Sequence, residues 1–288
     1  MVVVVSLLAA MTAPLSLLVL GPLALGVPHV IGDVRTLWLQ RPGGIGDRVV
    51  LCALAPLCVM TALRAAAAMG FAAPAWLEVA LGATAIGIGA HSGARGVNAK
   101  RIVTVLAVAL GLVLCAFPFA TTIGLAHAHN AIAFSVWAAW ARHRAGTWIA
   151  AACYVAAWGV ALLWPINAHA VSGDAFGMTS LRAASALAPG LDGAAADALV
   201  RSFVFAQLVH YGLWTFSLPS LNAHRRVAAA DRLLLVIAVV ACAIVPIAGA
   251  FHPLGVRDSY LSLSVFHGWL ELAIVAFLIA QRATGAKR

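Results

Sequence analysis

The chain has 288 residues, of which 64% are hydrophobic and only 9% are charged. A soluble domain averages about 25% charged residues, so a water-soluble protein of this length could not cover its surface with so few charges. Disordered, collagen-like and disulfide-rich proteins are excluded too, because they need polar, glycine-periodic or cysteine-dense sequence. The composition predicts an all-α, polytopic helical membrane protein.

The net charge of +9 does not indicate a nucleic-acid-binding protein. The basic residues are scattered and form no stripe with interleaved aromatic side chains, which a nucleic-acid surface needs. Membrane proteins collect basic residues in their cytoplasmic loops. We therefore expect membrane lipid and a lipophilic small molecule as partners, and no nucleic acid.

Nine apolar segments are candidates for helices that cross a bilayer, which takes about 20 mostly apolar residues. The first segment lacks the basic start of a signal peptide and is predicted to be a span. It contains Pro14, Pro22 and Pro28, so we expect it to be kinked or broken. The nine segments are 2–27, 49–69, 75–90, 102–122, 124–141, 148–168, 198–219, 233–251 and 259–280.

Lysine and arginine are concentrated in alternate loops of this nine-span topology, which together hold 14 of the 18 basic residues. The positive-inside rule then places the N-terminus outside and the C-terminus in the cytoplasm. We expect a multi-pass protein of a bacterial-type inner membrane, with residues 1–288 forming one integral-membrane domain. The outer loop 169–197 is the longest, and its stretch 182–188 is predicted to form a short interfacial helix.

The run from Gly82 to Gly89 is rich in glycine and alanine. Small residues at this density allow two membrane helices to approach closely. We predict a structural role for this run in helix packing.

Five of the ten histidines lie in or at the ends of apolar segments. An ionised side chain in the bilayer costs roughly 2.5–3.5 kcal/mol on insertion scales. The presence of each of these histidines in an apolar segment therefore calls for a structural or functional explanation. Neutral imidazole is the commonest metal ligand among side chains, although a lone histidine on an apolar helix is often a hydrogen-bonded core residue. The candidate metal ligands are His29, His127, His129, His210 and His267.

Two of the histidines have a carboxylate four residues later, namely Asp33 after His29 and Glu271 after His267. Residues i and i+4 share one face of a helix. Asp33 and Glu271 are therefore predicted to orient a ligating imidazole or to ligate the metal themselves. The alternative is that each carboxylate only hydrogen-bonds its neighbouring histidine.

Other polar and aromatic residues accompany the remaining histidines. His127 and His129 point about 200° apart on a regular helix, so one helix cannot direct both at the same metal, whereas Asn130 shares a face with His127. Tyr211 follows His210 directly, and Trp214 lies four residues after it. We predict that Asn130, Tyr211 and Trp214 contact the substrate.

The sequence Gly26-Val-Pro-His-Val-Ile-Gly-Asp33 resembles the Gly-Leu-Pro-His-x-x-x-Asp motif of the Brp/Blh family, bacterial membrane proteins that cleave β-carotene to retinal. That family carries further histidines on three later segments, and His127 with His129, then His210, then His267 follow here in the same order. The resemblance implies a histidine-ligated non-haem iron that uses dioxygen, with a carotenoid as the substrate.

The leading hypothesis is therefore an intramembrane non-haem Fe(II) dioxygenase that acts on a lipophilic substrate. One alternative is a b-type haem or quinone-linked electron carrier in which His210 and His129 are axial ligands. Another is a transporter that uses the histidines as a proton relay. A scaffold protein with purely structural histidines is the third.

Overall fold

The computed structural model describes residues 1–31, 45–71, 73–141, 146–164, 174–213 and 229–285. These residues are almost all helical, which confirms the predicted fold class. The described part of the chain has one antiparallel ribbon, in which β1 (Asp174–Ala175) pairs with β2 (Met178–Thr179). The chain forms two compact units, unit 1 with Met1–Asp33 and Asn130–Tyr260, and unit 2 with Val34–His129 and Leu261–Arg288.

Among the residues that the structure describes, four helical stretches are long and apolar enough to cross a membrane, as a multi-pass membrane protein requires. They are Pro14–Ile31, Asp47–Ala67, Val97–Ala116 and Pro253–Ala283. Three shorter apolar helices cover Val2–Thr12, Thr147–Leu163 and Val239–Phe251. The full count of nine spans and the orientation of the termini stay predictions.

Proline decides where several of the helices end. The first apolar segment is broken as predicted, into α1 (Val2–Thr12), α2 (Pro14–Gly21) and the π-helix η1 (Pro22–Gly26). The expected boundary near residue 123 was wrong, because α6 (Val97–Ala116) ends before Pro118, which begins α7 (Pro118–Ala141). Proline lacks an amide hydrogen and is tolerated in the first turn of a helix, so it marks the start of the next helix.

The last predicted segment, 259–280, is also divided differently in the structure. Its residues belong to α13 (Pro253–Ser264) and α14 (Phe266–Ala283), with the break at Val265. No proline or glycine lies between Ser262 and His267, so no helix-breaking residue marks this break in the sequence. The break lies two residues before His267 and therefore helps to position that histidine.

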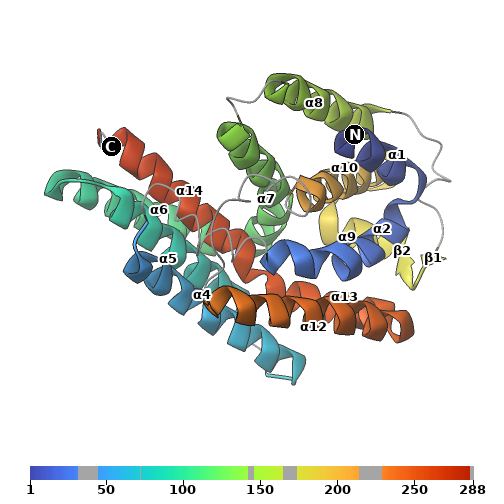
Figure 1. Cartoon of the computed structure of the whole chain (residues 1–288), viewed down its shortest axis with the longest axis horizontal. Helices are drawn as coiled ribbons and strands as arrows, with labels where there is room; N and C mark the ends of the chain where they lie inside the picture. Colours follow the sequence, from blue (N-terminus) through green and yellow to red (C-terminus); the bar gives the residue numbers. More distant parts are fainter. Residues whose placement is uncertain (32–44, 72, 142–145, 165–173, 214–228, 286–288) are drawn as a thin grey trace. The chain divides into compact units, whose positions relative to one another are not determined.

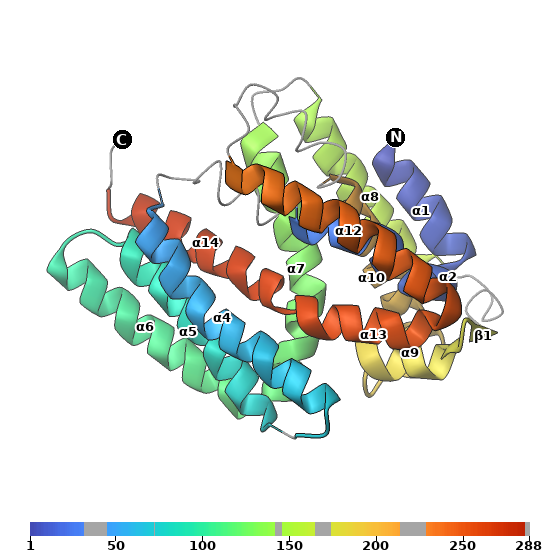
Figure 2. The same ribbon diagram turned by 60° about the horizontal axis from the view of Figure 1, so that its bottom comes forward.

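Unit 2 is built around α5 (Ala75–Gly93), which packs against α4 (Asp47–Ala68), α6 and α14 (Figures 1 and 2). The backbones of α5 and α14 touch, because a Cβ atom at Gly89 would overlap the carbonyl oxygen of Ala273 and one at Gly93 would overlap that of Phe277. The predicted packing role of the glycine-rich run is confirmed.

Two partly buried charged residues in the apolar helices α4 and α5 neutralise each other. Arg64 donates from Nε to Glu78 Oε2 over 2.8 Å and from a terminal nitrogen to Oε1 over 2.5 Å. Such a two-pronged bond between guanidinium and carboxylate has the geometry of the strongest side-chain ion pairs. This ion pair explains how apolar segments can accommodate Arg64 on α4 and Glu78 in the first turn of α5.

Unit 1 is organised on α10 (Gly193–Gly212), whose second half is buried. It packs against α1, α8 (Thr147–Leu163) and α9 (Ser180–Leu187). The expected helix in the outer loop is α9, and the hydroxyl of Thr179 caps it by accepting a bond from the amide of Arg182 over 3.2 Å. Unit 1 also contains α12 (Ala229–Phe251).

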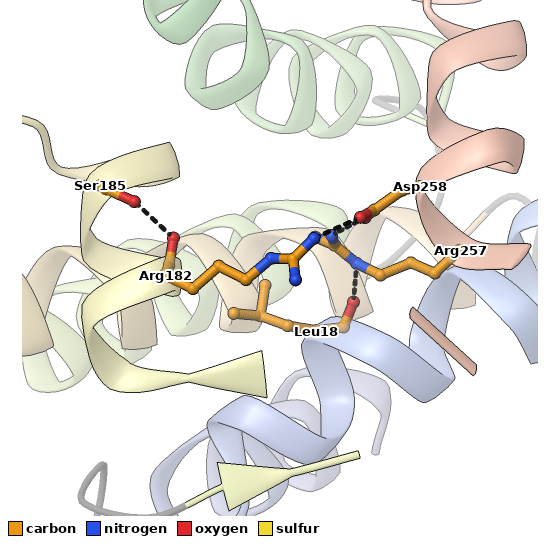
Figure 3. A network of polar contacts seen from close by, with 5 residues as sticks. All are labelled: Leu18, Arg182, Ser185, Arg257 and Asp258. Atoms are coloured by element: carbon orange, nitrogen blue, oxygen red, sulfur yellow. Dashed lines mark hydrogen bonds and ion pairs between the residues drawn. The ribbon is translucent and has the colours of Figure 1, made fainter. Parts of the chain in front are cut away.

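An arginine compensates for the hydrogen bond that Pro22 cannot donate. A regular helix would satisfy the carbonyl of Leu18 with the amide of residue 22, which proline lacks. Instead, Arg257 Nε donates to this oxygen over 2.7 Å (Figure 3). Asp258 accepts one bond from Arg257 over 2.6 Å and one from Arg182 of α9 over 2.7 Å. The broken helix that leads to His29 is thereby tied to α13 and α9.

Replacing Arg257 with methionine should lower the stability of unit 1. The change leaves the carbonyl of buried Leu18 without its donor, and an unsatisfied buried group costs about 1–3 kcal/mol. Thermal unfolding of the detergent-purified chain measures the effect. Arg182→Met is the matched control, because its ion pair with Asp258 is about half exposed and such surface pairs contribute roughly 0–1 kcal/mol. Equal losses in the two variants would contradict this account.

Candidate metal-binding histidine pairs

Two histidines from distant parts of the sequence meet in unit 2. His129 lies on α7 and His267 lies at the start of α14, and their Nε2 atoms are 3.1 Å apart. The rings meet edge to face, with centroids 4.7 Å apart. Gly268 lies beside the ring of His129, where a Cβ atom would make an ordinary contact with His129 Nδ1 at 3.5 Å.

The other ring nitrogen of each of these two histidines faces an acceptor. His267 Nδ1 is hydrogen-bonded to the carbonyl oxygen of Ser264, the last residue of α13. A carbonyl only accepts, so this nitrogen carries the hydrogen and a neutral ring keeps its lone pair on Nε2. His129 Nδ1 lies 3.0 Å from Glu271 Oε2, and the carboxylate favours the same tautomer.

These contacts have an electrostatic consequence for the space between the two rings. Two neutral imidazoles in this tautomer would direct lone pairs at each other across 3.1 Å. A proton or a metal cation between the two Nε2 atoms removes the repulsion. The pair His129–His267 is therefore suited to hold a positive charge.

A second histidine pair lies inside unit 1. His29 follows η1, His210 lies on α10, and their Nε2 atoms are 2.7 Å apart. Both side chains are buried, with 0% and 1% of their surface exposed. The ring of Tyr211 lies 5.3 Å from that of His29 and its hydroxyl accepts a bond from Gln207. An ionisable pair at this depth requires compensation of the kind that a bound ligand or a shared proton supplies.

The nitrogen separation in unit 2 matches that of two ligands on one metal ion. Metal–nitrogen bonds of about 2.0–2.1 Å with angles of 90–110° at the metal put neighbouring ligand atoms roughly 2.9–3.4 Å apart. The observed separation is 3.1 Å in unit 2, whereas the 2.7 Å in unit 1 is shorter than this range and is the distance of a hydrogen bond between the two rings. Axial haem ligands lie on opposite sides of the porphyrin, about two bond lengths apart, so neither pair by itself has that geometry.

Four of the five predicted ligands thus lie in pairs, and each offers one ring nitrogen to a metal ion. His127 lies two residues before His129 and faces another side of α7, as the helical repeat requires. Asn130 is buried on the same helix. The predicted roles of His127 and Asn130 stay predictions.

Two predicted site residues, Asp33 and Trp214, lie outside the described residues, so their roles stay predictions as well. Glu271 was expected to act on His267, four residues earlier on its own helix. The structure instead shows it beside His129, on the facing helix α7. This contact differs from the local expectation because the Ser264 carbonyl already occupies Nδ1 of His267.

The carbonyl of Ser264 is the functional group that the sequence did not reveal. Its role depends on the end of α13, where the last carbonyl groups of a helix lack helical partners.

Comparisons with protein-family models, with curated proteins and with solved structures gave no match to this chain. The resemblance to the Brp/Blh family therefore stays a prediction from the sequence.

Proposed function

We propose that this chain is a membrane-bound, histidine-ligated non-haem iron oxygenase that acts on a lipophilic substrate. The observation that carries the metal is the pair His129–His267, in which both Nδ1 atoms face acceptors and both Nε2 atoms face each other across 3.1 Å. A ligating histidine almost always donates its second ring nitrogen to a carboxylate or a carbonyl. In this pair, a carbonyl accepts from one Nδ1 and a carboxylate lies at ion-pair distance from the other.

We propose further that the two histidine pairs serve a single ion, as the sequence predicts. One pair supplies two ligands, whereas transition-metal sites in proteins generally have three or four. His29, His129, His210 and His267 together give four imidazoles. Asp33 and His127 are the remaining candidates for ligands or orienting groups.

Iron and dioxygen are proposed from the Pro28-His29 motif and the order of the later histidines. When bound, iron supplies activation of dioxygen. The carboxylate of Glu271, 3.0 Å from His129 Nδ1, favours the tautomer of His129 that leaves Nε2 to ligate. The apolar helices around the pairs exclude water from a reactive substrate. A carotenoid is the substrate class that the resemblance favours.

Metal analysis of the detergent-purified chain tests the proposal. We expect about one iron per chain in the wild type, by mass spectrometry after purification without chelators. His267→Ala and His29→Ala should each lose most of it, because removing one ligand from either pair opens the shared site. His252→Ala is the matched control, since this exposed histidine lies at the junction of α12 and α13.

Three other results would contradict the proposal. Absence of any metal in the wild type would favour the proton-relay transporter. A Soret band in the optical spectrum would instead indicate the haem alternative. Two ions per chain, each lost with one pair, would show that the pairs are separate sites. Cleavage of an added carotenoid to a shorter carbonyl product by the iron-loaded chain is the test of substrate class.

A further inference from the structure

A groove of about 790 Å³ lies between α4, α5 and α6 in unit 2. Small residues keep it open, among them Gly87 on α5 with Ala107 and Gly111 on α6. None of the residues of α6 is buried, so the side of α6 that lines the groove is accessible to a ligand. The lining is almost entirely apolar along these two helices and suits a hydrocarbon chain.

One end of the groove is polar and positively charged. Arg48, His91 and Thr104 line it, where α4 begins, α5 ends and α6 starts. The hydroxyl of Thr104 donates to the carbonyl of Lys100 over 2.8 Å and lies 2.9 Å from His91 Nδ1. Because that hydroxyl hydrogen is used, Thr104 accepts from Nδ1–H of His91, and the ring donates from Nε2 to an anion in its protonated form.

The chain around this end adds further cations. Between His91 and Thr104 the sequence carries Arg95, Lys100 and Arg101 and no acidic residue. A basic cluster at the end of membrane helices attracts anionic lipid, at about 1 kcal/mol for each cation near the membrane surface. The polar end therefore complements a negatively charged headgroup.

The length of the groove corresponds to one leaflet of a bilayer. Its lining on α6 extends from Thr104 to Cys115, a rise of about 16 Å at 1.5 Å per residue. Half of a hydrocarbon core of about 30 Å is about 15 Å. An acyl chain that starts at the charged end would thus follow the groove to the bilayer midplane.

We propose that this groove binds one anionic phospholipid. Its phosphodiester lies at Arg48 and His91, and one acyl chain follows the small residues of α5 and α6. The site is separate from the histidine pairs and does not depend on the proposed iron chemistry. A purely apolar molecule would leave the polar end without a partner, which is why the headgroup belongs to the proposal.

Native mass spectrometry of the detergent-purified full chain tests this site. The chain is titrated with phosphatidylglycerol or with phosphatidylcholine that has the same acyl chains. We expect one phosphatidylglycerol per chain, bound about fivefold more tightly than phosphatidylcholine for each cation near the headgroup, because the choline of phosphatidylcholine offsets its phosphate charge. Arg48→Gln should remove most of this preference. Arg101→Gln, which takes a cation from outside the groove lining, should have a smaller effect.

A substitution that fills the groove distinguishes lipid binding in the groove from general attraction of anionic lipid to the basic surface. Ala107→Phe places a ring in the groove and should abolish the retained phosphatidylglycerol. Ala109→Phe, the same change two residues later on another face of α6, should leave it bound. Unchanged thermal unfolding of both variants shows that the fold is intact. Equal affinities for the two lipids, or a lipid retained in Ala107→Phe, would overturn the proposal.

Discussion

Replacing Glu271 with glutamine is expected to weaken metal binding about 10–100-fold, the usual effect of losing a carboxylate that supports a ligating histidine. Glu271 Oε2 lies 3.0 Å from His129 Nδ1 and is largely buried. Glutamine has nearly the same size and still offers an oxygen, but its amide lacks the charge that makes the imidazole a stronger ligand. Titration of the metal-free chain with Fe(II) without oxygen, or with Co(II) as a spectroscopic probe, measures the change in Kd.

The matched control for this prediction is Glu78→Gln. Glu78 is the partly buried glutamate that pairs with Arg64 on α4, so its replacement also removes one buried negative charge from unit 2. The control should lower thermal stability and leave the metal affinity unchanged. If Glu271→Gln binds metal as tightly as the wild type, Glu271 does not act through His129 and the proposed ligand arrangement in unit 2 is wrong.

Replacing Gly89 with alanine should strongly destabilise unit 2. The added Cβ would overlap the carbonyl oxygen of Ala273, and a backbone group cannot move aside by changing rotamer. Overpacking usually costs about 1–3 kcal/mol and occasionally more, and we expect the upper end or beyond. The unfolding temperature and the yield of monodisperse protein in detergent report the loss.

Gly87→Ala is the control, since it makes the same change on the same helix only two residues away. A Cβ at Gly87 would lie 3.5 Å from that of Ala107, which is an ordinary contact. Alanine in a helix is favoured over glycine by roughly 0.5–1 kcal/mol, so this variant should be as stable as the wild type or slightly more stable. If Gly89→Ala were equally harmless, α5 and α14 would not be in backbone contact.

The two histidine pairs show why the site could be predicted only in part. The sequence singled out the histidines because ionisable residues are rare in apolar segments, which is a property of each residue by itself. Their pairing is a long-range property, since His129 and His267 are 138 positions apart and His29 and His210 are 181 apart. The expected partnership of Glu271 with His267 followed the helical repeat and missed the histidine on the facing helix.

The sequence by itself determined the all-helical class, the breaks at Pro14 and Pro22, and the close-packing role of the glycine-rich run. Each of these follows from composition or from the chemistry of one residue within its own segment. Only the tertiary structure decided which helix faces met, which tautomer each paired histidine adopts in unit 2, and how Arg257 reaches the carbonyl of Leu18. In helices that are apolar on every side, the hydrophobic pattern does not distinguish a face that meets lipid from one that meets another helix. Packing between segments supplies that distinction.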